Sequence, residues 1–98
     1  MIQRQRLDPL GKPGYRVAKD GDKEVWIRLL EDGSKAVGLF NRGEKETTVT
    51  ANWPDLQVSG KQLVRDLWRQ KDLGSFNGSF KATVQRHGVV MVKMSQTE

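Results

Sequence analysis

Residues 23–42 read KEVWIRLLEDGSKAVGLFNR and predict a β-hairpin. Two apolar-rich runs, 25–30 and 36–41, flank the turn sequence Glu31-Asp32-Gly33-Ser34. An Asp-Gly pair between such runs is a strong hairpin signal, because the turn needs a positive φ that glycine adopts without steric cost. This stretch therefore makes the chain β-rich.

The first run of the hairpin has two different faces. Alternation along a strand places three aliphatic residues on one side, Val25, Ile27 and Leu29. The opposite side mixes charged residues with Trp26 and Leu30. We expect the aliphatic side to lie in the core. The mixed side is either a docking surface or a surface that the residues before the first strand cover.

Turn signals recur at the spacing of a β-sandwich or small barrel along the rest of the chain. We expect further strands at residues 15–19, 47–53, 79–85 and 89–94, mostly antiparallel and seven or eight in all. Residues 1–14 contain two prolines and two glycines and are predicted to form a tail or linker. The predicted domain thus covers residues 15–94, with a short tail at 95–98.

One segment, KQLVRDLWRQKD at residues 61–72, fits two structures. Its apolar residues follow an i, i+1, i+4, i+5 spacing, which by periodicity favours a short amphipathic helix. A strand covered on both faces is the alternative.

The composition limits the function classes. The 98 residues correspond to one domain. Their net charge of +5 comes from 17 cations dispersed among 12 acids, which is typical of a solvated surface and does not favour nucleic-acid binding. Without cysteine there are no disulfides and no cysteine zinc sites. No apolar run is long enough to span a membrane, and the first residues lack the apolar region of a signal peptide, which leaves the compartment open.

Few residues are candidates for chemistry. Asp66 and Asp72 are the best-placed carboxylates for glycoside hydrolysis, and His87 is the only histidine. A sandwich of this size offers no deep cleft in which to raise the pKa of one acid, so we expect structural or surface roles for all three. Neither the separate turn aspartates nor the scattered glycines match a metal or phosphate motif, and we expect no cofactor. Trp53 and Trp68 are predicted to lie in the core.

Three segments together resemble a known domain: residues 24–56 (EVWIRLLEDGSKAVGLFNRGEKETTVTANWPDL), 64–74 (VRDLWRQKDLG) and 87–94 (HGVVMVKM). They are similar to the C-terminal β-sandwich domain of glycoside hydrolase family 27, the α-galactosidases (melibiases) and α-N-acetylgalactosaminidases. Residues 8–12, DPLGK, resemble the connector that enters this domain from the catalytic barrel. Residues 1–7 do not resemble the end of a barrel strand.

The resemblance implies an antiparallel Greek-key β-sandwich of about eight strands in two sheets, and it favours a strand at residues 63–68. It also implies that catalysis takes place on a preceding (β/α)8 barrel, where two aspartates act without metal or cofactor. Neither aspartate has a matching position in this sequence. The chain is therefore expected to be a non-catalytic accessory domain of an α-galactosidase-like enzyme.

The expected partner is that catalytic barrel. We predict a barrel-docking surface formed by six residues: Asp8, Pro9, Leu10, Trp26, Arg28 and Leu30. Two alternatives remain at this stage. One is a stand-alone carbohydrate-binding module, and the other is a basic nucleic-acid-binding barrel.

Overall fold

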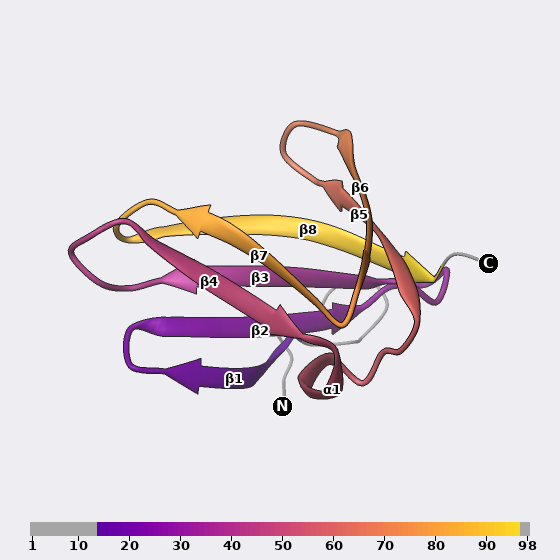
Figure 1. The fold of residues 1–98 in the computed structure, drawn as a ribbon, viewed down its shortest axis with the longest axis horizontal. Coiled ribbons are helices and arrows are strands. Elements are labelled where there is room, and N and C mark those ends of the chain that lie inside the picture. Colours follow the sequence, from indigo (N-terminus) through magenta and orange to yellow (C-terminus); the bar gives the residue numbers. More distant parts are fainter. Residues whose placement is uncertain (1–13, 97–98) are drawn as a thin grey trace, which may run out of the picture.

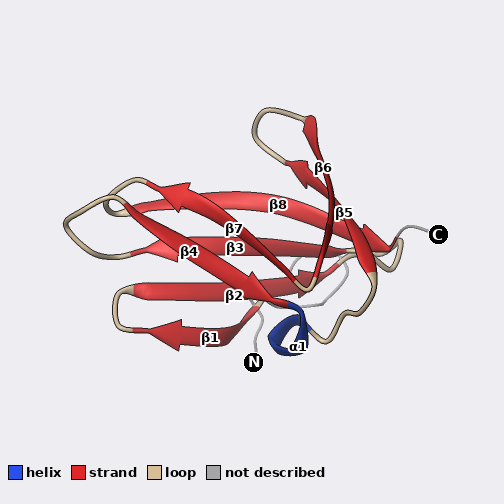
Figure 2. Cartoon of the chain, viewed as in Figure 1, coloured by secondary structure: helices blue, strands red, loops and turns tan. Residues whose placement is uncertain are grey.

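The computed structural model describes residues 14–96, which form eight strands and one short helix (Figures 1 and 2). The strands are β1 (Tyr15–Asp20), β2 (Lys23–Leu29), β3 (Lys35–Asn41), β4 (Thr47–Asn52), β5 (Lys61–Asp66), β6 (Lys71–Asn77), β7 (Ser79–Val84) and β8 (Gly88–Gln96). The helix α1 (Trp53–Leu56) follows β4 directly.

The strands form two antiparallel sheets. One has six strands in the order β1-β2-β3-β8-β5-β6, and the other consists of β4 and β7. Figure 1 shows β4 and β7 crossing in front of β3 and β8, so the small sheet covers one face of the large one. The expected all-β antiparallel sandwich of about eight strands in two sheets is confirmed.

The hairpin of residues 23–42 is present in the predicted place. Pairing of β2 with β3 runs from Lys23 opposite Asn41 to Leu29 opposite Lys35, and Gly33 has a φ of 89° in the turn. Asp32 accepts hydrogen bonds from the hydroxyl and the backbone N–H of Ser34, which hold the pKa of its carboxyl well below the ordinary value. Hydrogen bonds between residues of the turn itself thus stabilise it.

The core lies between the sheets and uses the inward face of each strand. Its buried members are Val25, Ile27, Val37, Leu39, Val49, Ala51, Trp53, Leu56, Val64, Phe80, Val84, Val92 and Met94. Trp53 is 3% exposed, as predicted, and its indole N–H donates to the carbonyl of Gly60 at 2.8 Å. Phe76 and Phe80 meet edge to face at 5.0 Å and join β6 to β7.

Two core predictions were wrong. Leu29 is 38% exposed because it lies at the hairpin end of β2, outside the core cluster. Trp68 is 66% exposed because β5 ends at Asp66 and the indole belongs to the loop before β6.

The ambiguous segment forms a strand, as the resemblance implied. The helix indicated by periodicity does not form, because β5 pairs with β6 on one side and with β8 on the other. The last strand is longer than predicted: β8 continues past residue 94, because Ser95 and Gln96 pair with β5.

Candidate functional site

The outer face of the six-stranded sheet, which the small sheet does not cover, carries an apolar depression. Trp26 of β2 lies opposite Gly38 of β3, which in turn lies opposite Met91 of β8. Together with Arg28 and Phe40, these residues line a depression of about 200 Å³. We call Trp26, Arg28, Gly38, Phe40 and Met91 the outer-face patch.

Gly38 determines how closely the apolar side chains of this patch approach one another. A Cβ atom at this position would lie 2.8 Å from Cε1 of Phe40 and 3.0 Å from the sulfur of Met91. Both contacts are shorter than van der Waals packing allows. The missing side chain therefore lets the phenyl ring and the thioether close over the middle of β3.

A charged cluster fixes the two rings of the patch. The indole N–H of Trp26 donates to Glu24 at 3.0 Å, and the same carboxylate pairs with Nε of Arg42 at 3.0 Å. The guanidinium of Arg42 lies over the Phe40 ring at 5.4 Å, and this ring meets Trp26 edge to face at 6.4 Å. The Trp26 and Arg42 interactions hold the pKa of the Glu24 carboxyl below its ordinary value. Nη1 of Arg16 lies 3.8 Å from the same carboxylate. The negative charge of the buried Glu24 is therefore balanced by two arginines.

The structure brings together some of the residues predicted to dock the barrel. Trp26 is half-buried, lies outside the core cluster and lines the depression with Arg28. Leu30 lies beyond the end of β2, in the hairpin connection, and is not part of the lining. Asp8, Pro9 and Leu10 lie outside the described residues.

Three members of the outer-face patch were not predicted from the sequence: Gly38, Phe40 and Met91. Alternation along β3 places Gly38 and Phe40 on the face of the sheet opposite to the core residues Val37 and Leu39. This alternation can be read from the sequence. However, only the register between β2, β3 and β8 places the three residues beside Trp26.

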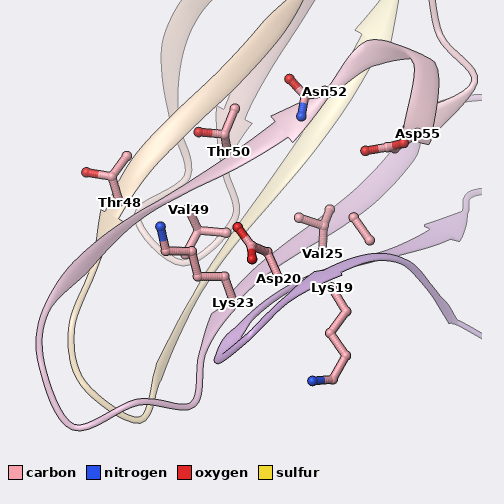
Figure 3. Close-up of a pocket in the computed structure, with 10 residues that line it drawn as sticks. Lys19, Asp20, Lys23, Val25, Thr48, Val49, Thr50, Asn52 and Asp55 are labelled. Atoms are coloured by element: carbon pink, nitrogen blue, oxygen red, sulfur yellow. The ribbon is translucent and has the colours of Figure 1, made fainter.

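A second, polar groove of about 300 Å³ lies between β1, β2 and β4 (Figure 3). Its polar lining includes Lys23, Thr48, Thr50, Asp20 and Asp55. Figure 3 shows the two carboxylates at separate places along the groove, with Asp55 within α1 and Asp20 at the end of β1. The groove therefore does not present a pair of acids flanking one bond, as glycoside hydrolysis needs.

The remaining candidates for chemistry have structural partners. Asp66 accepts a hydrogen bond from the backbone N–H of Arg69 at 2.8 Å, and Asp72 pairs with Arg65 at 2.9 Å. His87 lies in the turn before β8 and contacts Glu44 at 2.9 Å. Within residues 14–96, no three histidine or acidic side chains are grouped so that they could hold a metal ion. In the same range, no helix is long and apolar enough to cross a membrane.

Comparison with known proteins identifies the domain. Residues 20–94 match the family described as the α-galactosidase C-terminal β-sandwich domain. The chain belongs to this family. It is 39% identical over 82 residues to an α-galactosidase of Coffea arabica, covering 82% of this chain and 22% of that enzyme. It also superposes on α-galactosidase I of Mortierella vinacea with a TM-score of 0.84 and 31% identity, covering 90% of this chain and 24% of that one.

The same domain also resembles part of an enzyme with a different name. An isomalto-dextranase of Arthrobacter globiformis is 45% identical over 74 residues, which cover 66% of this chain and 12% of the enzyme. In the relatives described here, the chain spans less than a quarter of the whole length. The match is confined to the C-terminal sandwich, so these 98 residues do not include the catalytic barrel of such enzymes.

Proposed function

We propose that this domain packs against a catalytic (β/α)8 barrel of an α-galactosidase-like glycoside hydrolase and stabilises it. The observation that carries the proposal is the outer-face patch, an apolar depression with two fixed aromatic rings on the side of the large sheet opposite to the small sheet. Clustered aromatic and arginine side chains are the usual anchors of protein interfaces. The relatives support a barrel as the occupant, since this chain corresponds to less than a quarter of each.

The geometry of the patch suits docking better than it suits catalysis. Trp26 has its indole N–H satisfied by Glu24 within the domain, so its ring can be buried by a partner without leaving a polar group unpaired. The Glu24–Arg42–Phe40 contacts hold the rings in place before binding, which lowers the entropy lost on association. Trp26 and Arg28 are the central residues of this proposed surface.

The substrate of the parent enzyme does not follow from this domain. Relatives that share it are named for α-galactosides in one case and for isomalto-dextran in another. A domain whose role is to support the barrel can accompany barrels of different specificity. We therefore assign it an α-galactosidase-like parent on the strength of the family, and we assign no substrate contacts to the outer-face patch.

A domain replacement tests this proposal. This chain would replace the C-terminal domain of the Coffea arabica α-galactosidase, to which it is 39% identical. The half-life of activity at elevated temperature would be measured for the chimera and for Met91→Glu and Trp26→Glu variants of it. An unpaired charge buried at an interface costs several kcal/mol, so we expect at least a tenfold shorter half-life.

Thr50→Glu is the matched control, because Thr50 is exposed on β4 of the small sheet. It should leave the half-life unchanged. Urea denaturation of the isolated 98-residue variants separates loss of docking from loss of folding. Half-lives that are equal for the Met91→Glu, Trp26→Glu and Thr50→Glu chimeras would contradict the proposal.

A further inference from the structure

A third depression, of about 400 Å³, lies on a flank of the sandwich. It opens between the loop that joins β5 to β6 and the strand β7, above the start of β8. Its lining includes one large aromatic residue, four polar residues and aliphatic groups of β8: Trp68, Asp66, Arg69, Thr83, Gln85 and Val89. Trp68 is the most exposed large hydrophobic residue of the described chain, at 66%.

The loop that carries this indole is held on both sides. At its start, the backbone N–H of Arg69 donates to Asp66 at 2.8 Å. At its end, the guanidinium of Arg65 donates to the carbonyl of Gln70 at 2.8 Å. Leu67 also donates its N–H to the carbonyl of Met91 at 3.0 Å. These contacts keep the loop, and with it the exposed ring, in place on the edge of the depression.

We propose that this depression binds an uncharged pyranoside. A pyranose ring has an apolar face of C–H groups and a rim of hydroxyls, and the lining offers both kinds of partner. The Trp68 ring supplies an exposed aromatic face for stacking. The carboxylate of Asp66, the guanidinium of Arg69 and the hydroxyl of Thr83 supply acceptors and donors for the sugar hydroxyls. The volume lies in the usual range of small-ligand sites.

The same residues disfavour a nucleic acid. Stacking on one aromatic ring is common to sugars and bases. However, phosphates are bound by clustered cations, whereas Arg69 is the one cationic residue among the described residues of this lining and the acidic Asp66 lines the same depression. A neutral ligand with hydroxyl groups fits a lining with one cation and one anion better than a polyanion does.

This site is independent of the proposed docking surface. Thr83 belongs to β7 in the small sheet, whereas the outer-face patch lies on the opposite side of the large sheet. Within residues 14–96, the two depressions share no lining residue. The pyranoside site can therefore be tested on the 98-residue chain alone, and its failure would not affect the docking proposal.

Titration by NMR tests the inference directly. Methyl α-D-galactopyranoside and isomaltose would be added separately to the ¹⁵N-labelled chain, and the three indole N–H signals would be followed. We expect the Trp68 signal and the backbone signals of Arg69 and Thr83 to shift, with a dissociation constant on the order of 1 mM for so small a ligand. The signals of Trp26 and Trp53 should stay in place. A comparison of the two dissociation constants shows which ring stereochemistry the site prefers.

Three variants complete the experiment. Trp68→Ala should abolish the shifts while the spectrum remains dispersed, because the residue is largely exposed. Trp68→Phe should retain weaker binding, because a smaller ring still stacks. Leu73→Ala, a control at an exposed apolar residue of β6, should bind like the parent chain. The inference is overturned if neither sugar causes shifts at ten times the expected dissociation constant, or if Trp68→Ala binds like the parent.

Discussion

Asn41 is the buried polar residue that holds one end of the sandwich together, and its removal is the sharpest test of the fold. The residue ends β3 and is 2% exposed. Its Nδ2 donates to the carbonyls of Lys45 at 2.7 Å, Val84 at 3.1 Å and Gln85 at 3.2 Å. Its Oδ1 accepts from the backbone N–H of Gly43 at 2.8 Å. One side chain thus connects the β3–β4 loop to the end of β7.

The structure gives the size of the effect of Asn41→Ala. The substitution removes the hydrogen-bond partner of four backbone groups. Two of these groups, the N–H of Gly43 and the carbonyl of Val84, form buried hydrogen bonds with Asn41 in the native structure. A buried group without a partner costs about 1–3 kcal/mol, so the free energy of unfolding should fall by about 2–6 kcal/mol. The other two carbonyls belong to exposed residues and can accept from water. The loss is a large part of the ~5–15 kcal/mol expected for a domain of this length.

Urea denaturation followed by tryptophan fluorescence measures this loss. With a slope of about 1–3 kcal/mol per molar urea, the midpoint should fall by about 1 M or more while the slope stays constant. Asn41→Asp keeps the acceptor for Gly43 but loses both donors, so it should be no more stable than the alanine variant. Asn52→Ala is the control, since Asn52 is exposed and its side chain forms no cap hydrogen bond with α1. Equal midpoints for Asn41→Ala and Asn52→Ala would refute the reasoning.

Two further predictions concern the outer face. Gly38→Ala should lower the free energy of unfolding by about 1–3 kcal/mol, because the new Cβ would lie 2.8 Å from Phe40, and an unchanged urea midpoint would contradict the packing described. Glu24 has a folded-state pKa below its ordinary value of 4.5, so its contribution to stability is present above that pH and is lost as the pH falls through the lower, folded-state value. Glu24→Gln should therefore flatten the dependence of the melting temperature on pH in this acidic range, most visibly at low salt, whereas parallel curves for the two proteins would count against the Trp26–Glu24–Arg42 cluster.

Local sequence patterns predicted most of the strands. The Asp-Gly turn of residues 23–42 and the strands predicted at 47–53 and 79–85 appear as expected, and both strands contribute residues to the core. These features succeed because turn chemistry and a two-residue period act over a few residues. The family motifs added what local pattern could not, namely the strand β5 at a place where periodicity indicated a helix.

The candidate sites were only partly predictable. Trp26 and Arg28 were identified from alternation on one strand. Gly38, Phe40 and Met91 join them only through the register of three strands, two of which are separated by many residues in the chain. The exposed Trp68 was predicted to be buried, because an indole in an apolar run resembles a core residue until the end of the strand is known.

The sequence by itself determined the β-rich character of the chain, its turns and its family, because these depend on neighbouring residues and on motifs in order. The tertiary structure decided which faces are covered. With six strands in one sheet and two in the other, the small sheet protects a single side of the large one. The hairpin residues Val25 and Ile27 therefore lie in the core, while Trp26 between them is half-buried on the side opposite to the small sheet. Burial depends on what packs above a strand, and that packing is set by contacts distant in sequence.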